Sequence, residues 1–203
     1  MKSLMLMMSG LVIGAWLAPA APIFPQCPAI GLDTNGCELL VTVTAVTTLG
    51  AATAFTVAVS NPDQGPYEGA EDTLIGIVNN ATTPLKSIFF SGLVAGDGIF
   101  DLDGDGACAL IGCVNGAGDT SGYGGPGVFY TGIGGTLNSR GTVNFAGAGI
   151  ANNGTAWFSL EGVISAQVLA GAAPEPGTFG LLGVTILALA VKLRRKQGTS
   201  NGE

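Results

Sequence analysis

Histidine is absent from the 203 residues of this chain, and basic side chains are few. Without histidine, neither a Ser-His nor a Cys-His pair can activate a nucleophile. Between the two apolar ends of the chain only Lys86 and Arg140 are basic, against twelve acidic side chains, for a net charge near −10. Nucleic acid is bound through clustered lysine and arginine, so such a surface repels it and attracts divalent cations instead. We expect no nucleic-acid partner and no enzymatic activity. The enzymatic alternative is a glycoside hydrolase that uses a pair of carboxylates.

The first 21 residues have the three parts of a secretory signal peptide. Lys2 is followed by an apolar run over residues 4–17 and by the small residues Ala18, Ala20 and Ala21 around Pro19. The run is shorter than the roughly 20 apolar residues that a membrane span needs. We therefore expect an exported chain that is cleaved near Ala20 or Ala21.

The C-terminal end has a second apolar segment of marginal length. Residues 179–191 carry no charge, and four basic side chains follow at positions 192, 194, 195 and 196. Thirteen helical residues span roughly 20 Å, which is short of the ~30 Å hydrocarbon core of a bilayer. The basic end stays cytoplasmic, which leaves the preceding domain outside.

Pro174, Glu175 and Pro176 lie just before this segment. A Pro-Glu-Pro motif, an apolar helix and a basic end, in this order at the end of a chain, resemble the PEP-CTERM sorting signal. The resemblance covers about the last thirty residues, although the polar extension at 197–203 departs from it. It implies that an exosortase, which is a membrane transpeptidase, recognises the motif and removes the tail. It also implies a host that makes extracellular polysaccharide, and a transient stay in the inner membrane before release to the cell envelope or the medium. A plain C-terminal anchor is the alternative.

The middle of the chain is typical of short β-strands. Residues 41–44 alternate valine and threonine, and Phe55, Val57 and Val59 repeat this period of two. Clusters of glycine, proline, asparagine and aspartate separate the segments. We expect an all-β domain, an antiparallel β-sandwich, over residues 22–172, between the signal peptide at 1–21 and the sorting tail at 173–203. Its predicted strands are residues 38–49, 54–60, 73–78, 85–91, 128–131, 142–145 and 155–160.

Residues 96–127 are rich in glycine and aspartate and poor in long apolar runs. Asp101, Asp103 and Asp105 alternate with other residues before Gly106, which is the opening half of a Ca²⁺ loop. An EF-hand is excluded, because its twelfth position is Gly112 instead of glutamate. Two interpretations remain. The loop forms another kind of structural Ca²⁺ site, completed by Asp97, Asp119 or carbonyl oxygens, or it is an acidic turn that binds nothing.

Four cysteines form two close pairs, Cys27 with Cys37 and Cys108 with Cys113. In an exported chain an even number of cysteines indicates disulfides, and local pairing is the simplest of the three connectivities. A zinc site would need closer spacing and often histidine.

Export without catalytic residues points to a structural protein of the cell surface or extracellular matrix. A carbohydrate-binding module for exopolysaccharide is the alternative, since aromatic side chains stack on sugar rings. The candidate stacking residues are Tyr67, Tyr123, Phe129, Tyr130 and Trp157. Core packing is the alternative for them, and it is favoured for Phe129 and Trp157 because these two lie in strand patterns.

Overall fold

The computed structural model describes residues 26–33, 36–59, 65–94, 96–114, 116 and 119–171. The predicted signal peptide, Pro174, Glu175, Pro176 and the apolar segment after them lie outside these residues. Among the helices of the described part, none has the length and apolar composition that a membrane span requires.

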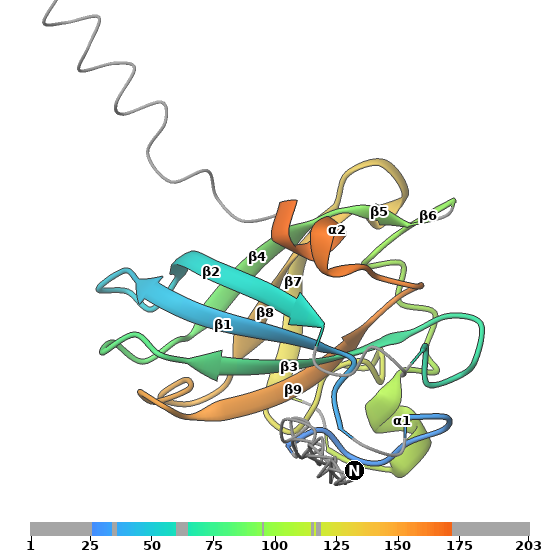
Figure 1. Cartoon of the computed structure of the whole chain (residues 1–203), viewed down its shortest axis with the longest axis horizontal. Coiled ribbons are helices and arrows are strands. Elements are labelled where there is room, and N and C mark those ends of the chain that lie inside the picture. The colour runs from blue at the N-terminus through green and yellow to red at the C-terminus, as the bar shows by residue number, and fades with distance from the viewer. Residues whose placement is uncertain are drawn as a thin grey trace, which may run out of the picture.

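Two sheets packed face to face form the framework of the described chain (Figure 1). The first sheet has the strand order β2 (Ala52–Val59), β1 (Leu39–Val46), β3 (Thr73–Asn79), β9 (Thr155–Leu160). The second has the order β4 (Ser87–Ser91), β8 (Arg140–Phe145), β7 (Val128–Gly134). The shorter elements are β5 (Leu93–Val94), β6 (Asp97–Gly98), α1 (Ala107–Ile111), the 3₁₀ helix η1 (Thr136–Asn138) and α2 (Ala166–Gly171).

The all-β prediction is confirmed, and each predicted strand overlaps an observed one. The expectation of a purely antiparallel arrangement is wrong for one pair of strands, because β1 and β3 pair in parallel. β1 and β2 form a hairpin, so the chain leaves β2 at the end of the sheet where β1 began. β3 starts again from that end, on the free side of β1, and must therefore run in the same direction as β1.

The alternation of side chains along the strands builds the main core. Leu39, Val41 and Val43 of β1 point to the interior and are fully or almost fully buried. They join apolar side chains from both sheets, among them Ile77, Phe90 and Phe158. α2 adds Leu169 to this core although no helix was predicted, since six residues are too few for a helical period to be visible in the sequence.

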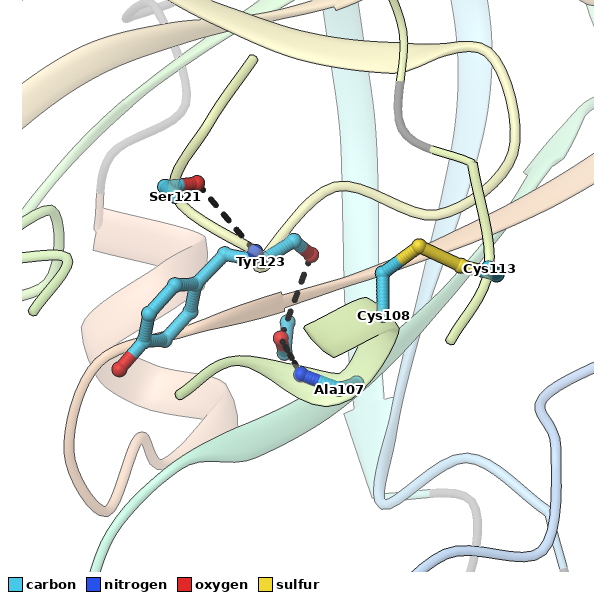
Figure 2. The surroundings of a disulfide bond; sticks show 6 residues. Ala107, Cys108, Cys113, Ser121 and Tyr123 are labelled. Carbon is cyan, nitrogen blue, oxygen red and sulfur yellow. Dashed lines mark hydrogen bonds between the residues drawn. A yellow bond between two sulfur atoms is a disulfide. The ribbon is translucent and has the colours of Figure 1, made fainter. Parts of the chain in front are cut away.

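A second, smaller core lies on the other face of the first sheet. Leu74 and Trp157 point outward from β3 and β9 and are covered by Tyr67 and the two disulfides. Both predicted pairings, Cys27–Cys37 and Cys108–Cys113, are present. Figure 2 shows the second disulfide near Tyr123; it joins Cys108, in the first turn of α1, to Cys113, which follows the helix. This core and the hydrogen bond from Ser159 N–H to Tyr123 O hold the segments around α1 against the first sheet.

Candidate functional site: an acidic centre

Two buried carboxylates lie side by side at one end of the first sheet. Asp72 comes directly before β3 and Glu161 directly after β9. Because these strands are antiparallel and Thr73 is paired with Leu160, the two acids continue the same register beyond the last pair. Asp72 is 0% exposed and Glu161 is 8% exposed, which is unusual for acidic side chains.

The hydroxyl of Tyr123 lies at the point where these acids and the predicted aspartates converge. It is 2.6 Å from Glu161 Oε2, 2.9 Å from Asp105 Oδ1, 3.1 Å from Asp72 Oδ1 and 3.2 Å from Asp103 Oδ1. A phenol has one hydrogen to donate, so it can serve only one of these four oxygens at a time. We call Asp72, Asp103, Asp105, Glu161, Tyr123 and the neighbouring Glu68 the acidic centre.

The backbone on both sides of α1 holds Tyr123 in this place. Its N–H donates to the Ser121 hydroxyl (Figure 2). Its carbonyl accepts from the Ser159 N–H at 2.8 Å. The Ser159 hydroxyl also accepts the N–H of Ala107, the first residue of α1. The Cys108 N–H donates to Gly122 O, so the Cys108–Cys113 disulfide braces the same segment. The predicted loop is therefore tied to β9, which carries Glu161 at its end.

Glu68 completes the centre on its exposed side. One carboxylate oxygen from each of Glu68, Asp72 and Asp105 lies within 4.8 Å of the others. Asp72 is further held by the hydroxyl of Tyr67, which donates to Oδ2 at 2.8 Å. Glu68 is exposed, so solvent reaches the centre from its side.

The electrostatics of the centre favour neutralisation by a proton or a cation. Burial, together with the neighbouring acids, raises the pKa of Asp72 and of Glu161 to about 7 each. Burial and the surrounding carboxylates also raise the pKa of Tyr123 well above its usual value, which keeps the phenol neutral. Lys86 and Arg140 are the only basic side chains in the described part of the chain; Lys86 directly precedes β4 and Arg140 begins β8, both in the second sheet.

The structure brings together two of the three aspartates that the sequence singled out. Asp103 and Asp105 belong to the acidic centre, whereas Asp101 points elsewhere and accepts a hydrogen bond from Asn138. Asp97 lies in β6, and Asp119 binds Ser121, so neither of these proposed completing ligands joins the centre.

Sequence reasoning missed Glu68, Asp72 and Glu161 as members of this centre, and it considered Tyr123 only as a sugar-stacking or core residue. The one available signal was an acid at the end of each of two apolar strands. That signal has meaning only once the pairing of β3 with β9 is known.

Chemically, this arrangement is suited to holding a hard divalent cation. Carboxylate oxygens are ligands that Ca²⁺ prefers, and a cation among them would remove the mutual repulsion of the acids. The ligands come from four separate segments, around residues 68–72, 103–105, 123 and 161, so a cation there would join them.

Residues 172–196 match the family model of the PEP-CTERM protein-sorting motif. Neither a curated protein nor a solved structure matches the chain. The sorting motif identifies the chain as an exported, envelope-associated protein that is directed to an exosortase.

Proposed function

Because the chain carries the PEP-CTERM sorting motif, we propose that it is a non-catalytic structural protein of the cell surface or extracellular matrix. A signal peptide at residues 1–21 starts its export, and the apolar segment at 179–191 holds it briefly in the inner membrane. Exosortase processing near Pro174-Glu175-Pro176 then delivers the β-domain to the envelope or the medium. The match at residues 172–196 is the observation that carries this proposal.

The burial of the aromatic side chains supports a structural role over sugar binding. Tyr67 and Tyr123 are fully buried, Trp157 is 9% exposed, and Phe129 and Tyr130 are partly buried. The Tyr130 hydroxyl donates to Ser159 O, which directs that ring into the molecule. A sugar ring needs an exposed aromatic face to stack on, and four of these residues are buried or packed against the core instead: Tyr67, Tyr123, Tyr130 and Trp157.

A structural Ca²⁺ at the acidic centre is part of the same proposal. The centre contains five carboxylates and a phenol hydroxyl, and two of its acids are more than nine-tenths buried. Extracellular Ca²⁺ modules bind at about 10⁻⁴ to 10⁻³ M, which suffices where the cation is abundant. Its role there is to stabilise the segments around α1, with no part in a reaction.

The sorting step is tested by replacing the motif in the producing bacterium. Pro174→Ala, Glu175→Ala and Pro176→Ala together should leave the protein membrane-bound with its tail uncut, as judged by fractionation and intact mass. Gly177→Ala with Thr178→Ala, next to the motif, is the matched control and should be processed normally. Normal release of the triple variant would contradict the exosortase step.

The molecular role is tested on the released domain. Incubation with insoluble polysaccharides, including exopolysaccharide from the producing strain, should leave the domain in the supernatant. Retention that a soluble fragment of the same polysaccharide reverses would establish the carbohydrate-binding alternative instead.

A further inference from the structure

The described domain ends immediately before the sorting tail. α2 ends at Gly171, the matched motif begins at residue 172, and the apolar segment begins at residue 179. The seven residues 172–178 can span at most about 25 Å when fully extended. A domain of this size has a radius of gyration of roughly 15 Å, and therefore a diameter of roughly 40 Å. While the tail is in the membrane, the side of the domain opposite α2 therefore cannot face the bilayer.

α2 is firmly attached to that end, so the tail leaves from a defined place. Leu169 is fully buried in the main core, and the side chain of Val168 packs against Gly92, where a Cβ would lie 2.7 Å from Val168 Cγ1. Figure 1 shows α2 together with β5 and β6 at one side of the molecule and α1 at the opposite side.

Three large apolar side chains are exposed beside α2. Leu93 is 53% exposed, Leu137 is 51% exposed and Val163 is 55% exposed. Their segments are in contact: Leu93 pairs with Gly98, which lies against the backbone of residues 137–139, and Gly162, the neighbour of Val163, packs against Val94. We call these three side chains the α2-end patch.

We propose that the α2-end patch lies in the interfacial zone of the bilayer while the sorting tail is inserted. The inference rests on the membrane-anchored step of the proposed function, because the short connection brings the patch to the lipid. The free energy falls when apolar side chains move from water into this zone. Arg140 is exposed near the patch, but so are Asp97 and Asp101, so the contact requires no particular lipid charge.

The short connection to the inserted tail allows a weak contact to keep the patch at the membrane. A short connection gives the patch an effective concentration at the membrane that a free domain never has. Three half-exposed side chains are too few for stable binding without it. Removal of the tail should therefore release the domain completely, which is what delivery to the envelope or medium requires.

The test uses the full chain reconstituted in zwitterionic phosphatidylcholine vesicles with and without brominated lipid. Val163→Trp places in the patch a tryptophan whose fluorescence is quenched by contact with brominated lipid. Val114→Trp is the matched control, since Val114 follows α1 at the opposite side and is 83% exposed. After subtraction of the wild-type emission, brominated lipid should cause a loss of fluorescence for Val163→Trp and none for Val114→Trp.

The outcomes separate this inference from the proposed function. Flotation with the vesicles reports tail insertion, and a chain that does not float would contradict both the anchored step and the membrane-facing patch. A chain that floats but shows equal quenching for both variants would overturn the patch alone. Equal quenching together with slower exosortase processing of Leu137→Glu would assign the patch to the enzyme, and would also overturn the lipid contact.

Discussion

Calcium should stabilise the folded domain, and Asp105→Asn should remove most of that effect. Ligand that binds only the folded state stabilises it by RT ln(1 + [L]/Kd). With 5 mM Ca²⁺ and an affinity of about 10⁻⁴ to 10⁻³ M, the gain is about 1 to 2 kcal/mol. For a domain of this size, the midpoint of thermal unfolding should then rise by about 3 to 8 °C.

The acidic centre also predicts the behaviour of the variant without metal. Oxygens of Glu68, Asp72 and Asp105 lie within 4.8 Å of one another, and a charged pair at that separation costs roughly 1 to 3 kcal/mol near a protein surface. Asp105→Asn removes one of these charges and one ligand. In chelator it should therefore unfold at the wild-type temperature or above, while its response to Ca²⁺ should shrink.

Asp101→Asn is the matched control, because Asp101 belongs to the same sequence motif but bonds to Asn138 outside the centre. Thermal unfolding of the released domain, followed by circular dichroism in 5 mM Ca²⁺ and in EDTA, measures all three proteins. Asp101→Asn should keep the full response to Ca²⁺. The metal site would be refuted if the wild-type midpoints coincide in the two buffers, or if Asp101→Asn loses as much of the response as Asp105→Asn.

Further predictions concern the second core. Burial, and to a lesser degree Asp33, raises the pKa of Glu38 to about 8, so the folded state holds a proton that the unfolded state releases above pH ~4.5. The free energy of unfolding should consequently fall as the pH rises from 5 to 9. In urea titrations, Glu38→Gln should make this fall smaller by roughly 3 to 5 kcal/mol. A variant with the pH profile of the wild type would contradict this. Gly76→Ala places a Cβ 2.5 Å from Cys37 Sγ and should destabilise the domain by about 1 to 3 kcal/mol in the same titrations, whereas Gly65→Ala, with open space around it, should not. Peptide mapping without reductant should find Cys27 linked to Cys37 and Cys108 linked to Cys113, and a peptide joining Cys27 to Cys108 would contradict this pairing.

Local patterns in the sequence were enough to predict the strands and the disulfides. β9 occupies the predicted residues 155–160, and β3 extends one residue beyond its prediction, because alternation of apolar side chains is a property of neighbouring residues. The cysteine pairs are separated by 10 and 5 positions, so proximity along the chain already favoured the observed pairing. The sorting motif was recognisable for the same reason, since its three parts lie next to one another.

Such local patterns could not predict the two short helices. α1 and α2 have five and six residues, less than two turns each, and a hydrophobic period of 3.6 cannot be read over so few positions. The parallel pairing of β1 with β3 was equally hidden, because it depends on which side of the first hairpin the returning chain occupies.

The sequence by itself therefore determined that the chain is acidic, β-rich, disulfide-bonded and marked for sorting. Only the tertiary structure decided which acids meet. Asp72 and Glu161 are distant in the chain, and the antiparallel register of β3 and β9 makes them neighbours. Asp101 and Asp105 are four positions apart, and yet only Asp105 reaches Tyr123. The physical reason is that a centre built from four segments depends on strand register and on the path of the loop around α1, and both are set by the packing of residues far apart in sequence.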